Sequence, residues 1–334
     1  MSTTTRIGGS EDQSMGATLL RQARSFVLNN TLTLFFAALV VLVAIIKPVF
    51  LDWGNIQSIL RGAAVIGIVA SGMTVVMVAG GFDLSVARVA ALCGIVVGLV
   101  NGHGPVLTIL AMLGVSLAIG LVNGTLIAKA KVNPFVVTLG MLSIAQTLTL
   151  VVSNGRVIRN LDPWLISVAQ GDVGPIPKAV IAFLIVAVVC HLLLSRTQFG
   201  RHVYSVGGNL EASRLAGIKV DRVLICCYVL VAVCSGIAGL VLTSRLSSAS
   251  PVAFPGGELD AIAAVIIGGT RLGGGHGTIL PGTLVGVLIL AAMNNGLILL
   301  GIDPDWQGLM KGSVIILAVG VDILQGRRSG RIRG

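Results

Sequence analysis

Apolar stretches long enough to cross a lipid bilayer dominate this chain. A membrane-spanning helix needs roughly 20 mostly apolar residues, with about 17 as the practical minimum. Charged residues make up only 11% of the 334 residues, too few to cover the surface of a soluble domain of this size. The sequence therefore predicts an all-α polytopic membrane protein. Nine stretches fit a span: Thr31–Ile46, Ile56–Ala79, Leu84–Val100, Val106–Ala128, Phe135–Val152, Ala179–Ser195, Val223–Ser244, Thr278–Leu300 and Gln307–Leu324.

A tenth apolar stretch, Leu259–Gly269, is short for a span, but the distribution of basic residues predicts that it crosses. Lys and Arg concentrate in the cytoplasmic loops of membrane proteins. If the N-terminus is inside and all ten segments cross, fifteen basic residues lie inside and five outside: Lys47, Arg156, Arg159, Lys178 and Arg245. If the tenth segment did not cross, the four arginines of the C-terminal tail would lie outside. We therefore predict about ten transmembrane helices with both termini cytoplasmic.

The chain divides into three parts by polarity. Residues 1–30 form a polar cytoplasmic segment, in which residues 16–30 place apolar side chains on one helical face and arginines on the other. This pattern predicts a helix on the inner membrane surface, with a disordered leader as the alternative. Residues 31–324 form the transmembrane domain, interrupted by a basic cytoplasmic loop at 196–222, and residues 325–334 form a basic cytoplasmic tail.

Short motifs recur in the two halves of the chain. Gly80–Leu84 and Gly256–Asp260 each open an apolar segment with a pair of glycines and an aspartate, 176 residues apart. Asn-Gly pairs follow at Asn123 and Asn295, 172 residues apart. Two pseudo-symmetric halves of five segments would give this order. Chance similarity is the alternative, because the chain has 44 glycines.

The cytoplasmic loop contains a short predicted helix with a signal at each end, within Gly207–Ile218. Asn209 is a good N-cap, because its side-chain oxygen can accept a free backbone N–H of the first turn. Glu211 lies in that first turn, where the helix dipole favours negative charge. Gly217 can adopt the left-handed conformation that ends a helix. Leu210, Leu215 and Ile218 give the helix a partial apolar face on which a soluble partner could dock.

Several functions lack the residues they need. No G-x-x-x-x-G-K-[ST] sequence occurs, so the chain is not expected to hydrolyse ATP. The five cysteines lie in apolar stretches and the four histidines are scattered, which predicts neither a disulfide, a metal site nor nucleophilic catalysis. The net charge of +10 marks the cytoplasmic side rather than a nucleic-acid partner. Asp83 lies near a segment boundary, and we expect it to pair with Arg88 rather than relay protons.

Uncharged polar residues lie within the predicted spans. Amides and hydroxyls without charge suit a neutral, hydroxyl-rich solute, and the alternative is that they bond neighbouring helices. The amides predicted to line a translocation pathway are Asn123, Gln146, Asn294 and Asn295. The hydroxyls and the other polar groups of the spans include Ser71, Thr74, Thr125, Thr138, Ser143 and Thr147.

Four ordered motifs carry a family resemblance that covers nearly the whole chain after residue 30. They are Gly81–Val86, Tyr204–Val220, Arg245–Gly277 and Asn294–Asp322. Together they resemble the permease subunit of a ribose-type monosaccharide ABC importer. Within the loop, Glu211-Ala212 followed by Gly217 is similar to the E-A-x-x-x-x-G motif with which such permeases contact their ATPase.

The resemblance implies the fold of an ABC importer permease in a bacterial inner membrane. Its implied partners are membrane lipid, a second permease copy or sister permease, a sugar-type ATPase subunit that binds ATP and Mg, and a periplasmic substrate-binding protein. This chain would bind no cofactor or metal, and it would not be an enzyme. The implied ATPase-coupling residues are Gly207, Gly208, Asn209, Glu211, Ala212, Arg214, Leu215 and Gly217.

Other functions remain open from the sequence. One is an ion-coupled secondary sugar transporter, and another is a passive channel. A third is an importer of the same family for a non-nutrient furanose such as autoinducer-2. The long polar N-terminus and the extra Leu210 before Glu211 depart from the ribose-type pattern and leave the substrate unassigned.

Overall fold

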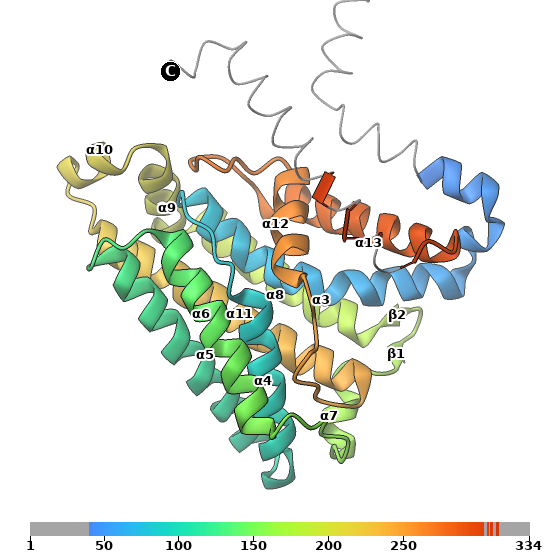
Figure 1. Ribbon diagram of the computed structural model, residues 1–334. Coiled ribbons are helices and arrows are strands. Elements are labelled where there is room, and N and C mark those ends of the chain that lie inside the picture. The colour runs from blue at the N-terminus through green and yellow to red at the C-terminus, as the bar shows by residue number, and fades with distance from the viewer. Residues whose placement is uncertain (1–39, 304–305, 307, 310–311, 314–334) are drawn as a thin grey trace, which may run out of the picture.

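The computed structural model describes residues 40–303, 306, 308–309 and 312–313. The predicted segment 1–30, the tail 325–334 and most of the first and last predicted spans lie outside the described residues. The described chain is a bundle of helices with a single short hairpin (Figure 1).

Seven helical segments are long and apolar enough to cross a membrane. Each coincides with a predicted stretch to within a few residues, which confirms the prediction of a helical polytopic membrane protein. They are α3 (Trp53–Val78), α4 (Val86–Val100) continued by η2 (Asn101–His103), α5 (Pro105–Ala128), α6 (Pro134–Ser153), α8 (Lys178–Arg196), α11 (Val220–Leu246), and η3 (Ile279–Thr283) continued by α13 (Leu284–Leu299).

The remaining described elements are short. The helical ones are η1 (Pro48–Leu51), α7 (Pro163–Ser167), α9 (Gln198–Gly208), α10 (Leu210–Leu215) and α12 (Gly257–Ile267). The strands β1 (Asp172–Val173) and β2 (Ile176–Pro177) pair antiparallel, with Asp172 opposite Pro177. Figure 1 shows α10 and this hairpin at opposite ends of the bundle, which we call the α10 side and the hairpin side.

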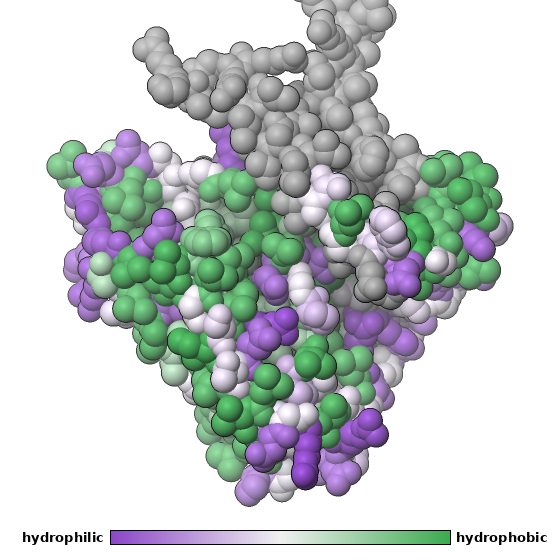
Figure 2. Space-filling view, in the orientation of Figure 1, coloured by the Kyte–Doolittle hydropathy of each residue, from purple (hydrophilic) through white to green (hydrophobic). Residues whose placement is uncertain are grey.

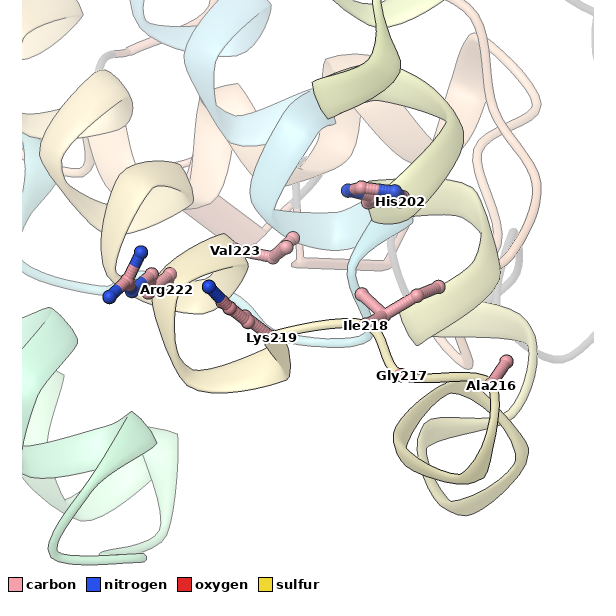
Figure 3. Close-up of a pocket in the computed structure, with 7 residues that line it drawn as sticks. All are labelled: His202, Ala216, Gly217, Ile218, Lys219, Arg222 and Val223. Carbon is pink, nitrogen blue, oxygen red and sulfur yellow. The ribbon is translucent and has the colours of Figure 1, made fainter.

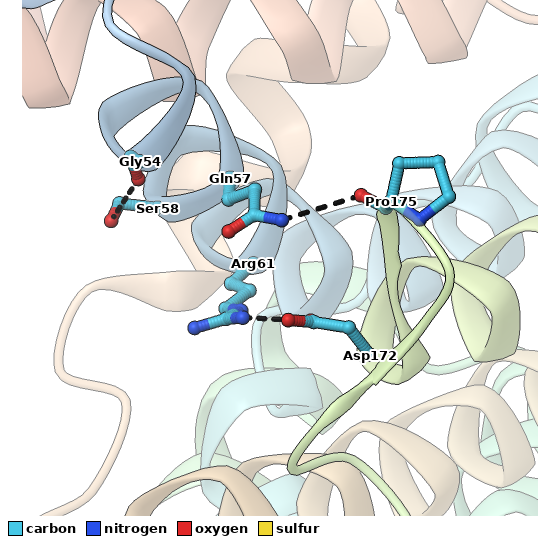
Figure 4. Close-up of polar contacts among 6 residues, drawn as sticks. All are labelled: Gly54, Gln57, Ser58, Arg61, Asp172 and Pro175. Atoms are coloured by element: carbon cyan, nitrogen blue, oxygen red, sulfur yellow. Dashed lines mark hydrogen bonds and ion pairs between the residues drawn. The ribbon is translucent and has the colours of Figure 1, made fainter.

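The hairpin is tied to the start of α3 by polar contacts (Figure 4). A nitrogen of the Arg61 guanidinium lies 2.7 Å from a carboxylate oxygen of Asp172. Gln57 donates from its side-chain nitrogen to the Pro175 carbonyl at 3.3 Å. Arg61 and Asp172 are both partly exposed, so this pair adds little stability but orients the hairpin.

The core is built around α11, which packs against α3, α4 and α5. Small residues let these backbones approach closely. A Cβ on Gly239 would lie 2.1 Å from the Ala90 carbonyl oxygen, and one on Gly120 would lie 2.6 Å from the Val229 Cα. In lipid the hydrophobic effect does not drive helices together, because the lipid tails are as apolar as the side chains. Close backbone packing of this kind holds the helices together instead.

The lipid-facing surface is contributed largely by α5 and α6. Figure 2 shows hydrophobic surface over these two helices and hydrophilic surface at the end that carries α10. Val106 and Leu110 on α5, and Val136 and Val151 on α6, are more than half exposed. In a bilayer this surface contacts lipid or another membrane protein, because both present apolar groups to it.

The tenth segment returns the chain across the bundle even though its helix is short. α12 has 11 residues, which span about 16 Å, roughly half the hydrocarbon core. Before it, Ala249 on the hairpin side pairs with Ile158 in an isolated β-bridge. After it, the Gly275 N–H donates to the Val78 carbonyl at 2.8 Å on the α10 side. Non-helical residues therefore cover the other half of the crossing, in support of the prediction that this segment crosses.

α4 and α12 contact each other and run in opposite directions. α4 begins after the motif Gly80–Leu84 and runs toward the hairpin side, whereas α12 begins within Gly256–Asp260 and runs toward the α10 side. Figure 1 shows their first turns close together in the middle of the bundle. Two helices of opposite direction that begin at matching motifs support the predicted inverted repeat.

The expected pair of Asp83 with Arg88 is wrong. Asp83 is 2% exposed, and one carboxylate oxygen accepts from the Ser85 N–H at 2.8 Å and from the Ser85 hydroxyl at 2.6 Å. The other oxygen accepts from the Asn123 amide at 3.4 Å. Among the described residues, no ion pair joins Asp83 to Arg88. The carboxylate stabilises the turn that leads into α4, within the bundle rather than at the membrane boundary.

The crossing of the α12 segment can be tested with reporter fusions. Three segments, α11, α12 and α13, separate Gly208 from Gly301. We expect fusions after Gly208 to report a cytoplasmic location, and fusions after Gly171 and Gly301 to report a periplasmic one. If fusions at Gly208 and Gly301 report the same side, the α12 segment does not cross.

Candidate coupling site and polar residues of the spans

α9 and α10 are consecutive short helices on the α10 side of the bundle, and a single residue separates them. Thr197 begins α9 by accepting the Gly200 N–H on its hydroxyl at 3.2 Å. Asn209 is extended (φ −159°, ψ 106°), and its side-chain oxygen accepts the Ala212 N–H at 2.9 Å. Asn209 therefore ends α9 and caps α10, which confirms its predicted role as N-cap.

The end of α10 also follows the prediction. Gly217 has φ +80°, in the left-handed region. The Gly217 N–H donates to the Arg214 carbonyl, and the Ile218 N–H donates to the Ser213 carbonyl, both at 3.0 Å. These paired bonds satisfy carbonyls that the last turn of a helix otherwise leaves free. The chain then continues directly into α11 at Val220.

The surface of α10 is highly exposed. Leu215 is 90% exposed, the largest exposure of a large apolar side chain among the described residues, and Leu210 is 37% exposed. Glu211 and Arg214 are exposed as well. Ile218, in contrast, packs against the core, so the predicted apolar face is reduced to two leucines. An isolated, fully exposed leucine on a rigidly capped helix is suited to docking in a partner's pocket.

Ion pairs connect α10 and the start of α11 to the connection between α5 and α6. Asp221 lies 2.8 Å from the Lys131 ammonium and 3.6 Å from the Arg214 guanidinium. Lys131 belongs to the connection between α5 and α6, so one carboxylate holds α10, α11 and that connection at the same place. All three side chains are close to half exposed, so the pairs position the elements more than they stabilise them.

A cavity of about 400 Å³ lies between α9, the end of α10 and the start of α11 (Figure 3). Three of its side chains carry nitrogen, those of His202, Lys219 and Arg222, and no acidic residue lines it. The remaining lining residues are Ala216, Gly217, Ile218 and Val223. The cavity gives the α10 side a basic recess beside the exposed helix.

The structure does not bring the four predicted pathway amides together. Asn123 on α5 is 1% exposed and donates to Asp83 and Ser85. Gln146 is exposed on α6. On α13, Asn295 exchanges two 2.9 Å amide bonds with Asn55 of α3, while Asn294 has a buried side-chain oxygen without a hydrogen-bond partner.

Many hydroxyls of the spans bond within their own helix. Ser71 donates to the Gly67 carbonyl and Thr138 to the Pro134 carbonyl, each four residues earlier. Thr74 bonds the Ala70 carbonyl and also lies 2.6 Å from the Thr283 hydroxyl, joining α3 to η3. Such bonds satisfy a hydroxyl in lipid without a ligand.

Two charged residues near the middle of the bundle were not assigned a site from the sequence. The Arg88 Nε on α4 and a carboxylate oxygen of Glu258 on α12 are both inaccessible and have no hydrogen-bond partner. The two side chains lie near enough to attract each other electrostatically. The sequence did contain a signal for Glu258, which is an acidic residue in the first turn of an apolar segment. Within the described residues, no group of three or more His, Cys, Asp or Glu is arranged to hold a metal ion.

Comparison with known proteins gives a consistent set of relatives. A family profile described as "Branched-chain amino acid transport system / permease component" matches residues 55–319. The ribose import permease protein RbsC of Bacillus subtilis is 43% identical over 288 residues, covering 85% of this chain and 89% of that protein. The fructose import permease protein FrcC of Rhizobium meliloti is 36% identical over 320 residues, covering 91% and 89%.

A third relative is the L-arabinose ABC transporter permease protein AraH of Azospirillum brasilense. It is 36% identical over 302 residues, covering 90% of this chain and 88% of that protein. No solved structure matches the chain.

Asn123→Leu tests whether this amide is structural. The substitution keeps the side-chain size but removes a donor to the buried Asp83 carboxylate, so we expect a loss of stability on the order of 1–3 kcal/mol. The measurement is thermal unfolding of the purified protein. Gln146→Leu is the control and should unfold like the wild type. A change in solute uptake without a change in unfolding temperature would instead support a pathway role for Asn123.

Gly217→Val tests the end of α10. No atom lies within 4 Å of a Cβ built at Gly217, so the substitution acts only through its left-handed backbone. A β-branched residue there should cost on the order of 1–2 kcal/mol and shift Leu215. We expect reduced co-purification of an ATPase partner at normal expression, with Gly217→Asn close to wild type because Asn tolerates this conformation. Equal co-purification of Gly217→Val and wild type would contradict a docking role.

Proposed function

The chain belongs to the family of branched-chain amino acid transport system permease components, and on that premise we propose that it is the membrane permease of an ABC importer for a neutral monosaccharide. The family match spans most of the chain. The relatives named above are permeases for ribose, fructose and L-arabinose. We further propose that it lies in the bacterial inner membrane with both termini cytoplasmic.

The observation that carries the proposal is the exposed, doubly capped helix α10. Asn209 and Gly217 fix both of its ends, and Leu215 projects almost fully into solvent. A helix this short is not stable without such caps. Leu215 and Leu210 give α10 an exposed apolar surface that suits contact with a partner.

The partner for α10 is proposed to be the ATPase subunit of the importer. The chain has no phosphate-binding loop, so the energy of ATP must enter through another subunit. ATP and Mg would be bound there. The exposed Glu211 and Arg214 beside Leu215 would add charge complementarity to the apolar contact and set the orientation of the docked subunit.

The substrate is proposed to be a neutral pentose or hexose, delivered by a periplasmic binding protein. Hydroxyl-rich solutes suit the uncharged amides and hydroxyls of the spans, and the relatives carry such sugars in their names. Another furanose, such as autoinducer-2, is the second candidate within the family. The pathway is proposed to lie between this chain and a second permease copy or sister permease. Such a pathway does not need the polar amides of one chain to lie together on one helix.

The proposal predicts which subunit hydrolyses ATP. The purified chain should hydrolyse none, and hydrolysis should appear with the ATPase subunit and rise when binding protein loaded with sugar is added. Uptake of D-ribose, D-fructose and L-arabinose into proteoliposomes is the direct measurement, with ATP inside and with an ion gradient as alternative energy sources. Uptake by this chain alone, driven by an ion gradient, would establish a secondary transporter and reject the ABC assignment.

A further inference from the structure

Three backbone segments from distant parts of the chain meet directly beneath α10. They are the end of α3 at residues 78–80, the end of α9 at residues 207–208, and the loop between α12 and η3 at residues 274–275. The Gly275 N–H donates to the Val78 carbonyl at 2.8 Å. We call this contact the glycine junction.

The centre of the glycine junction is Gly207, the residue two positions before the N-cap of α10. A Cβ on Gly207 would lie 1.8 Å from the Val78 carbonyl oxygen and 2.6 Å from the Gly275 nitrogen. Both are backbone atoms, so they cannot move aside as a flexible side chain would. Any side chain at residue 207 would separate all three segments.

The third segment fits as closely. A Cβ on Gly274 would lie 2.8 Å from the Gly207 oxygen and 2.9 Å from the Gly80 Cα. A side chain also joins the parts, because Tyr204 on α9 donates from its hydroxyl to the Gly277 carbonyl at 2.6 Å. A tyrosine phenol is protonated and able to donate at neutral pH, and burial raises the pKa of Tyr204 further.

Two of the three segments connect to helices inside the bundle, and the third, at residues 207–208, leads to α10. From Val78 the chain turns through Gly80–Leu84, where Tyr228 bonds the Phe82 carbonyl and Asp83 stabilises the turn before α4. On the other side, the 274–275 loop follows α12. The junction therefore connects α10 to both α4 and α12, whose first turns lie together in the middle of the bundle (Figure 1).

We propose that the glycine junction transmits movement of α10 to α4 and α12, and that Gly207 is the positioning residue on which this transmission depends. The inference rests on the proposed function, since the ATPase is what would move α10. Backbone-to-backbone contact has no side-chain torsions in which a displacement can be absorbed. A displacement of residue 207 must therefore move Val78 and Gly275 with it.

Gly207→Ala is the direct test. Gly207 is not among the glycines with positive φ, so the methyl group acts by separating the three segments. The exposed side chains of α10 are unchanged, so we expect the ATPase still to co-purify. We expect sugar uptake to fall at least tenfold, and the rise in ATP hydrolysis with loaded binding protein to disappear. Gly273→Ala is the matched control, because it adds the same methyl group beside the junction, where no atom lies within 4 Å, and it should behave as wild type.

Tyr204→Phe is a second variant that adds no atoms. It removes only the bond to the Gly277 carbonyl, and we expect it to lower uptake several-fold with only a small drop in unfolding temperature. If Gly207→Ala fails to accumulate in the membrane, the uptake measured with Tyr204→Phe tests the proposal. Normal uptake in Tyr204→Phe, or equal loss in Gly207→Ala and Gly273→Ala, would overturn the junction as a transmission point.

Hydrogen–deuterium exchange separates this inference from the choice of substrate. Binding of the ATPase subunit with ATP should change exchange in α12 of the wild type but not of Gly207→Ala, whichever sugar is carried. If wild-type α12 responds but none of the sugars is taken up, the proposed substrate is wrong and the junction stands. If wild-type α12 does not respond to a docked ATPase, the junction does not transmit.

Discussion

The need to satisfy every backbone polar group inside the bilayer shapes this protein more than any other constraint. Lipid offers no hydrogen bonds, so non-helical backbone is tolerated there only when protein covers it. The turn before α4 and the approach to α12 are both non-helical. The turn is largely buried, and in it Asp83 accepts the Ser85 N–H and the Tyr228 hydroxyl donates to the Phe82 carbonyl. In the approach to α12, Val252 and Pro255 stay exposed. The central position of α11 follows from this need, since it packs against α3, α4 and α5 together.

The same constraint explains where the glycines lie. A chain that must bring backbones into contact, without side chains to fill the space between them, needs residues with no Cβ. Gly239 fits against Ala90 within the bundle, and Gly207 fits against Val78 at its edge. The first contact holds two spans together permanently. The second joins a surface helix to the spans, and there the same packing makes a rigid link between the exposed α10 and the interior.

The long spans and the capped helix were predictable from the sequence because their signals are local. Seven apolar stretches became helices at nearly the predicted residues, and Asn209 and Gly217 cap α10 as their chemistry requires. The environment of Asp83 was not predictable, because it depends on Asn123, 40 residues away. Proximity to a segment boundary suggested an interfacial pair with Arg88. The turn before α4 instead lies inside the bundle, where Asp83 accepts hydrogen bonds from the neutral Ser85 and Asn123.

The polar residues of the spans were also harder to interpret than the composition suggested. A hydroxyl in a span has a partner available at every fourth residue of its own helix, and Ser71 and Thr138 use it. Asn123 and Asn295 bond side chains of neighbouring elements. Polar residues that hold helices together leave few specific groups to recognise a particular solute. Relatives named for ribose, fructose and L-arabinose are 36–43% identical to this chain, which fits spans whose polar residues serve mainly the fold.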